Sequence, residues 1–357
     1  MSDWLHTLVH PDRTLTLFIS TIFLLLVSFV GTGVFRKYAL KKNLLDIPNS
    51  RSSHSSPTPR GAGIVFVILT ILTTLITEIL YANSISESIF VLLAFTVVAL
   101  LGAIDDLYNL SPKLRLSIQL AASLAVLFTA GSIPTIQLFS DISITSPLIA
   151  GTIFTVGLIW MLNLFNFMDG TDGYAALEGI FISITGGVLL ILAQSAFWVW
   201  PFALAISLLG FLPWNLPTAK VFMGDVGSSF IGFFIACIAL LSHQENTISI
   251  WIWLILSGVF AVDATVTLLR RLILGNRYSD AHRTHAYQLI TRKYGNHWRA
   301  LKYASTLNIF WLLPMAIVAF IWPTIAFLLC IVAYTPLIFI IVCAGAGVDK
   351  NPNCQTS

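Results

Sequence analysis

Five aspartates stand in short polar stretches between the long apolar runs of this chain. Asp169 and Asp172 lie in "NLFNFMDGTDGYAA", directly after the apolar run "GTIFTVGLIWML". They are three residues apart, so on a helical turn they share a face, and the glycines beside them let backbone amides approach a ligand. Carboxylate ligands without thiolates favour Mg²⁺ or Mn²⁺, which is therefore the expected cofactor. The other three occur in "GAIDDLYNLSPKLRL" and "KVFMGDVGSSF", and they are Asp105, Asp106 and Asp225.

A basic stretch, "DAHRTHAYQ", supplies groups of the opposite charge. His282 and His285 have helical spacing, but the HExxH pattern of a zinc site is missing. Interleaved with Arg283, they are predicted to contact phosphate instead. Each polar stretch alone would also fit a solvated turn or helix end. Together they suit metal-dependent phosphoryl transfer on a diphosphate substrate, and the flanking apolar segments suit a lipid co-substrate.

The rest of the chain predicts a membrane scaffold for these groups. Hydrophobic residues make up 57% of the chain and charged residues 10%, against about 25% charged in soluble proteins. We therefore expect an all-α, polytopic integral membrane protein, with residues 1–357 forming a single domain. Apolar stretches of about 17–25 residues predict about eleven transmembrane helices. They are placed near 14–35, 62–81, 88–104, 114–131, 148–164, 175–194, 197–212, 228–242, 249–269, 304–321 and 323–345.

The basic residues predict how these helices are oriented. Nearly all of them fall in alternate connections, whereas the other connections carry acids, and the positive-inside rule then places the N-terminus outside and the C-terminus in the cytoplasm. The five carboxylates would all lie at the cytoplasmic face of the membrane. The net charge of +3 follows from this asymmetry and does not indicate a nucleic acid partner. The cytoplasmic catalytic loops are expected near 36–61, 105–113, 163–175, 213–227 and 270–303.

Four motifs in a fixed order carry a resemblance to a known family. "DDLYN", "NLFNFMDGTDGYA", "MGDVGSS" and "HRTHAYQ" are separated by spans and resemble the polyprenyl-phosphate N-acetylhexosamine-1-phosphate transferase superfamily. "DIPNSRSSHSSPTPRGAG" resembles the first cytoplasmic loop of that family. The peptidoglycan branch typically has three consecutive histidines where this chain has His-Arg-Thr-His. "VDATVTLLRRLILG" resembles the branch that initiates O-antigen and related glycans, which we favour.

The resemblance implies transfer of a sugar-1-phosphate from a UDP-N-acetylhexosamine to undecaprenyl phosphate, with release of UMP. Asp225, together with Asp169, would hold the metal, and Asp105 would act as the base or orient the lipid phosphate. The catalytic set would be Asp105, Asp106, Asp169 and Asp172. The substrate-binding set would be Arg60, Lys113, Asn163, Asn166, His282, Arg283 and His285.

Other functions remain open at this point. A polytopic transporter would also carry carboxylates within a bundle, although transporters usually place them near mid-membrane and show internal repeats. A CDP-alcohol phosphotransferase would need a different spacing after its DG pair than "DGYAAL" offers. A direct attack and a two-step route through an aspartyl-phosphate are both compatible with the residues. The sequence leaves open the sugar, the glycan pathway and the oligomeric state, a homodimer included.

Overall fold

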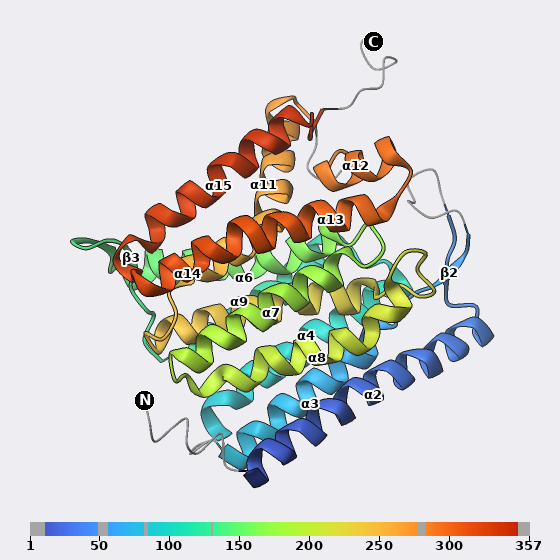
Figure 1. Ribbon diagram of the computed structural model, residues 1–357, viewed down its shortest axis with the longest axis horizontal. Helices are drawn as coiled ribbons and strands as arrows, with labels where there is room; N and C mark the ends of the chain where they lie inside the picture. Colours follow the sequence, from blue (N-terminus) through green and yellow to red (C-terminus); the bar gives the residue numbers. More distant parts are fainter. Residues whose placement is uncertain (1–10, 49–55, 82–84, 130, 277–282, 349–357) are drawn as a thin grey trace.

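The computed structural model describes residues 11–48, 56–81, 85–129, 131–276 and 283–348, and the chain there is almost wholly helical (Figure 1). The prediction of an all-α fold is confirmed. The long helices are α2 (Pro11–Lys41), α3 (Gly63–Tyr81), α4 (Ile85–Tyr108), α5 (Pro112–Thr129), α6 (Pro147–Met168), α7 (Tyr174–Leu192), α8 (Val199–Asn215), α9 (Gly224–Gln244) and α15 (Ala326–Cys343).

Shorter elements complete the fold. Two antiparallel strand pairs join β1 (Leu45–Asp46) to β2 (Thr58–Pro59) and β3 (Ile136–Phe139) to β4 (Ile142–Ile144). The remaining elements are η1 (Ala196–Trp198), α10 (Ile250–Leu256), α11 (Gly258–Ile273), α12 (Ala286–Tyr294), α13 (His297–Leu307), the π-helical η2 (Asn308–Leu312), α14 (Leu313–Ile321) and η3 (Pro323–Ile325).

Membrane-length helices dominate the described residues. Nine are long and apolar enough to cross a membrane, and a bent pair makes a tenth if it counts as one span. The polytopic prediction is confirmed, and each of the eleven expected spans coincides with a helix or helix pair. The expected span near 114–131 corresponds to α5, which is not among those nine or ten helices. Lys113 and Arg115 in its first turn make that helix less apolar than the others.

Helix α9 is the central helix of the bundle. In its membrane-length window 94% of the residues are buried, whereas only 11% are in that of α2, so α2 lies at the periphery. Phe95 of α4 meets a row of α9 rings, with centroids 4.8 Å away at Phe234 and 5.9 Å away at Phe230. This packing fixes the N-terminal end of α9, which carries Asp225, against its neighbours.

The span expected at 249–269 is broken, which corrects the prediction of one straight helix. Helix α10 ends at Leu256, α11 begins at Gly258, and the two are bent by 80°. The side chain of Ser257 donates a hydrogen bond of 2.9 Å to the carbonyl of Trp253. Hydropathy reports apolar length and not direction, so the break was invisible in the pattern. The expected loop at 270–303 is also largely helical, since it contains α12 and the start of α13.

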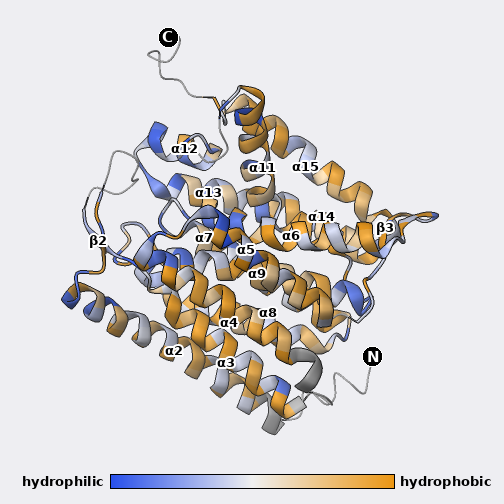
Figure 2. Cartoon of the chain, turned by 180° about the vertical axis from the view of Figure 1, so that it is seen from behind, coloured by the Kyte–Doolittle hydropathy of each residue, from blue (hydrophilic) through white to orange (hydrophobic). Residues whose placement is uncertain are grey.

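Polar residues gather mainly at the end of the bundle where β2 and α12 lie, while the helix shafts are mostly apolar (Figure 2). At this end α4 and α6 finish and α9 begins. The β3–β4 pair lies at the opposite end, where Trp251 Nε1 donates a hydrogen bond of 2.6 Å to the carbonyl of Gln137. One end of the molecule therefore carries the predicted site, and we call it the polar end.

Candidate active site

Asp106, at the end of α4, caps the N-terminus of α9. Its carboxylate accepts backbone hydrogen bonds from Asp225 (2.9 Å) and Val226 (3.2 Å). Arg60, which follows β2, donates to the same carboxylate from Nε and lies 2.7 Å from it through Nη2. A capping anion satisfies amides that a helix leaves unpaired and also complements the helix dipole. Asp106 thus joins three segments that are far apart in the sequence.

The neighbouring Asp105 is also fully engaged. Its Oδ2 lies 2.8 Å from Nη1 of Arg115 in α5, and its Oδ1 accepts a hydrogen bond of 2.6 Å from the amide of Leu110. The side chain is buried, so these contacts offset the cost of removing the charge from water. Asp105 is therefore held in a fixed orientation by Arg115, a residue outside the predicted site set.

Asp169 and Asp225, the two predicted metal ligands, have no ion pair with any described residue. Asp225 interacts electrostatically with Asp105, Asp106 and Arg60. Burial, followed by repulsion from Asp225, Asp106 and Asp172, raises the pKa of the Asp169 carboxyl well above its ordinary value, and Arg60 opposes this. In the described part of the chain no three acidic, histidine or cysteine side chains converge closely enough to hold a metal ion. The five aspartates have two arginine partners, Arg60 and Arg115, so acidic groups are in excess, and a cation would balance them.

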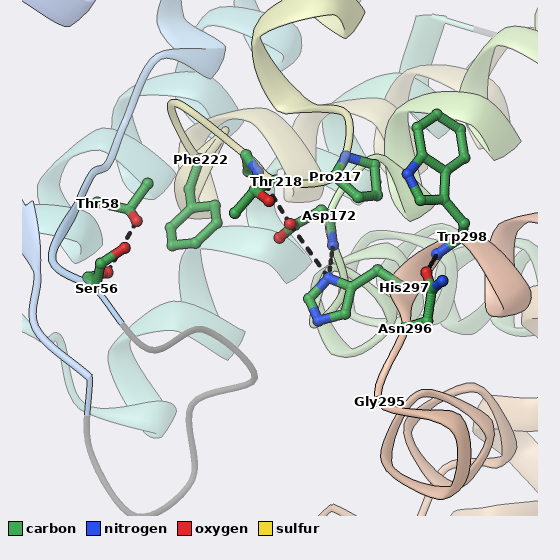
Figure 3. A pocket seen from close by; sticks show the side chains of 11 residues that line it. Ser56, Thr58, Asp172, Pro217, Thr218, Phe222, Gly295, Asn296, His297 and Trp298 are labelled. Atoms are coloured by element: carbon green, nitrogen blue, oxygen red, sulfur yellow. Dashed lines mark hydrogen bonds and ion pairs between the residues drawn. The ribbon is translucent and has the colours of Figure 1, made fainter.

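Asp172, which interacts electrostatically with Asp169, lines a pocket of about 260 Å³ (Figure 3). Its Oδ2 accepts a hydrogen bond of 3.0 Å from the amide of Ala219 and lies 3.2 Å from Nδ1 of His297. The same ring nitrogen lies 3.3 Å from the amide of Asp172. The other lining residues come from the β2 segment, the connection before α9 and the start of α13: Ser56, Thr58, Pro217, Thr218, Phe222, Gly295, Asn296 and Trp298.

Residues 283–287, which we call the donor loop, are anchored by Asp263 of α11. The Asp263 carboxylate accepts hydrogen bonds from the amides of Ala286 (2.9 Å) and Tyr287 (3.1 Å) at the start of α12. Nδ1 of His285 lies 3.4 Å from the same carboxylate. Tyr287 then reaches the carbonyl of Phe167 with its hydroxyl, at 3.0 Å. The donor loop is thereby brought against the turn that carries Asp169.

Some predicted residues take other positions. Asn163 donates to Gln119 of α5 at 2.9 Å and to the carbonyl of Ile159, so it joins two helices. Asn166 donates to Ser229 of α9 at 3.2 Å and braces α6 against α9. Lys113 is exposed at the start of α5 and makes no ion pair with a described residue. His282 lies outside the described residues.

Neither His297 nor Asp263 is among the site residues predicted from the sequence. His297 lies at the start of a helix that hydropathy assigned to a loop, and no local motif marks it. Asp263 carried a signal, because an isolated acid within an apolar helix needs buried hydrogen-bond donors. One donor, Thr267, lies on the same helix, but the two amide donors at the start of α12 lie more than twenty residues further along the chain and could not be read from the helix itself.

Comparison with known proteins decides the family. Residues 88–243 match the family model described as glycosyl transferase family 4. The chain is 30% identical over 277 residues to the undecaprenyl-phosphate alpha-N-acetylglucosaminyl 1-phosphate transferase of Thermotoga maritima, covering 77% of this chain and 82% of that protein.

The chain belongs to glycosyl transferase family 4.

Two further relatives represent different parts of this family. The probable undecaprenyl-phosphate N-acetylglucosaminyl 1-phosphate transferase of Bacillus subtilis is 28% identical over 289 residues, covering 77% of each chain. The phospho-N-acetylmuramoyl-pentapeptide-transferase of Enterococcus faecalis is 28% identical over 228 residues, covering 60% of this chain and 68% of that protein. The predicted superfamily is thus confirmed.

Proposed function

We propose that this protein transfers N-acetylhexosamine-1-phosphate from a UDP-sugar to undecaprenyl phosphate and releases UMP. The relatives in Thermotoga maritima and Bacillus subtilis are named for transfer of N-acetylglucosaminyl 1-phosphate involving undecaprenyl phosphate, which supports the acceptor and favours N-acetylglucosamine as the sugar. The observation that carries the proposal is the acid cluster at the polar end. Asp169 and Asp225 form no ion pair with a described residue there, although both interact electrostatically with Arg60.

The carboxylate chemistry of this site suits a divalent cation, although no three acidic, histidine or cysteine side chains of the described residues converge there. Asp169 and Asp225 would hold it, because hard carboxylate oxygens suit Mg²⁺ or Mn²⁺ and both groups lack a described ion pair. When bound, such an ion supplies positive charge to the diphosphate oxygens as the leaving group departs. Asp105 and Asp106 are already engaged with Arg115 and Arg60, so we assign them to holding the cluster in place.

The pocket beside Asp172 suits the nucleoside part of the donor. Phe222 offers an aromatic face, while Thr218 and Asn296 offer hydrogen-bonding groups. At about 260 Å³ the pocket is smaller than ordinary ligand pockets of about 300–1,000 Å³, so we place only the nucleoside there. The diphosphate would then extend toward Asp169, with Arg60 and the donor loop neutralising its charge.

In the proposed reaction the protein itself forms no covalent bond to the substrates. An oxygen of undecaprenyl phosphate forms a bond to the sugar-bearing phosphorus, the bond from that phosphorus to UMP breaks, and UMP leaves with the electron pair. The lipid phosphate is already mostly anionic near pH 7, so a general base is not required. Arg60 and Arg283 would bind the transferred group, and positioning and charge neutralisation would provide most of the rate.

We further propose that the protein acts in the cytoplasmic membrane of a bacterium, with its polar end in the cytoplasm, and starts a lipid-linked glycan such as O-antigen. The basic residues near the polar end support this orientation. The His-Arg-Thr-His sequence supports glycan initiation over the peptidoglycan reaction.

One assay tests the proposal. Purified protein is incubated with undecaprenyl phosphate, Mg²⁺ and each of several UDP-N-acetylhexosamines, and lipid product and UMP are measured together. We expect equal amounts of both, none in EDTA, and recovery with Mg²⁺ or Mn²⁺ but not with Zn²⁺. Uptake of a solute into proteoliposomes without product formation would favour a transporter instead.

A further inference from the structure

The chain beyond α15 folds back onto the donor loop. Residues 344–348, which we call the C-terminal turn, leave the membrane-length helix and curl over the end of α11. The amide of Gly347 donates a hydrogen bond of 3.0 Å to the carbonyl of Thr284, the residue between Arg283 and His285. Ala346 and Thr284 are both buried, so this contact is part of the packed interior.

Helix α11 also holds the C-terminal turn, through Arg270. Nη1 of Arg270 donates to the carbonyl of Ala346 at 2.6 Å and to that of Val342 at 3.3 Å. Gly347 has φ of +80°, which disfavours any residue with a side chain. A Cβ at this position would lie 2.9 Å from both Cβ of Arg270 and the carbonyl oxygen of Thr267, so neither neighbour could give way by rotating a flexible side chain.

The contact continues from the donor loop to the acid cluster. Two residues after Thr284, the amides of Ala286 and Tyr287 are bound by Asp263, whose Oδ1 also accepts from Thr267 at 3.0 Å. Tyr287 touches the carbonyl of Phe167 and interacts electrostatically with Asp169. A continuous series of contacts thus connects Gly347 to Asp169.

We infer that the C-terminal turn is a positioning element of the active site, with Gly347 as its essential residue. It fixes the position of Thr284 relative to α11, and so determines where Arg283, His285 and the start of α12 lie relative to Asp169. The inference rests on the proposed function in one respect, namely that residues 283–287 bind the donor. Since its contacts are with Thr284 and with the ends of α11 and α15, we expect its loss to affect the UDP-sugar and spare the lipid.

The test compares Gly347→Ala with Gly131→Ala in the full-length protein. Gly131 also has a positive φ, +64°, but no atom lies within 4 Å of its Cβ position, and it lies between α5 and β3, away from the polar end. Amide hydrogen exchange of residues 284–290, the KM of each substrate, kcat and the apparent Tm are measured for both variants. In Gly347→Ala we expect exchange at Ala286 and Tyr287 and the UDP-sugar KM each to rise about tenfold, as loss of a positioning hydrogen bond allows. The KM for undecaprenyl phosphate should stay within about twofold.

A second variant, Arg270→Lys, keeps the positive charge on a shorter side chain that should hold the two carbonyls less well, so it should change the same two quantities in the same direction by a smaller factor. Unaltered exchange and donor KM in Gly347→Ala would overturn the inference. So would a lower Tm and kcat with an unaltered donor KM, since that marks mere packing. If the wild-type protein transfers no sugar at all, the proposed function fails, and the exchange data alone then judge the positioning role.

Discussion

At the scale of single residues, the acids of the polar end divide into two kinds. Asp105, Asp106 and Asp172 each have a positively charged or histidine partner, whereas Asp169 and Asp225 do not. The motifs indicated that all five would meet, and they do lie at one end. Their different roles could not be predicted, because the partners come from distant positions: Arg60 lies 46 residues from Asp106, and the α9 amides lie 119 and 120 residues away.

Two isosteric substitutions separate these roles. Asp225→Asn should abolish activity yet raise the apparent Tm in EDTA, because it removes a like charge from beside Asp105 and Asp106. Asp106→Asn should lower the Tm, since an amide nitrogen replaces one of the two oxygens that accept from α9 and Arg60 loses its charged partner, and a hydrogen bond to a charged group contributes about 1.5–3 kcal/mol. Thermal melts and product assays on both variants check this. A fall in Tm for Asp225→Asn would mean that this carboxylate is structural.

The raised pKa of Asp169 predicts how stability depends on pH. Below the ordinary Asp pKa near 4, the folded and unfolded states both hold the proton. As pH rises through the window between that value and the raised one, only the folded state retains it, so stability falls. In EDTA the Tm should therefore decrease with rising pH across this window. Mg²⁺ should restore it increasingly at higher pH, because a metal ligand must be deprotonated.

Asp169→Asn is the control for this experiment. It should flatten the decline in Tm and weaken the response to Mg²⁺. Identical profiles with and without Mg²⁺ in the wild-type protein would contradict the assignment of Asp169 as a ligand.

At the scale of elements, α12 and the turn after α6 are matched to each other through one glycine. A Cβ on Gly170 would collide with the hydroxyl of Tyr287, whose ring stacks on Tyr174 with centroids 4.9 Å apart. Burial, reinforced by Asp263 and Asp169, raises the pKa of the Tyr287 hydroxyl, so it stays a neutral hydrogen-bond donor. From the sequence, the glycines of this turn were predicted to let backbone amides approach a ligand. That Gly170 leaves room for the hydroxyl of Tyr287 could be seen only in the fold.

Gly170→Ala should therefore push α12 away from Asp169 and lower kcat/KM by at least about tenfold, the cost of misplacing catalytic groups. Tyr287→Phe removes the colliding oxygen and loses one hydrogen bond, so it should cost less. The double variant should be more active than Gly170→Ala alone. Steady-state kinetics on the three proteins check this coupling. If the two effects simply add, the collision is not what disables the alanine variant.

At the scale of the whole molecule, the hydropathy pattern was sufficient for the bundle but not for its bends. Apolar length alone located α3, α6 and α9 to within a few residues. The break at Ser257 and the helical character of 286–307 depend on tertiary contacts, such as those of Asp263 with α12, and so lay beyond any window along the chain.

The orientation of the bundle remains a prediction with a direct test. Reporter fusions within 36–60, 163–175 and 276–303 should all report the cytoplasm, because these segments meet at the polar end. A fusion at Ser140 or Asp141, between β3 and β4, should report the opposite side. Accessibility of the fused reporters in intact cells supplies the measurement. Two of the polar-end sites reporting opposite sides would refute the arrangement.

The close contacts beneath the acid cluster have a consequence for engineering. A Cβ on Gly63 would lie 2.6 Å from the backbone of Gly227, and one on Gly102 would lie 2.6 Å from the backbone of Val226. The backbones of α3, α4 and α9 are therefore in direct contact where these helices cross. A substitution that adds a side chain at Gly63 or Gly102 cannot be accommodated there. The donor loop and the start of α13 are joined to this region through side chains and single hydrogen bonds. Sugar preference should accordingly be transplantable between relatives by exchanging residues 283–298 together with 344–348, whereas exchange of the crossing helices should yield proteins that fail to assemble.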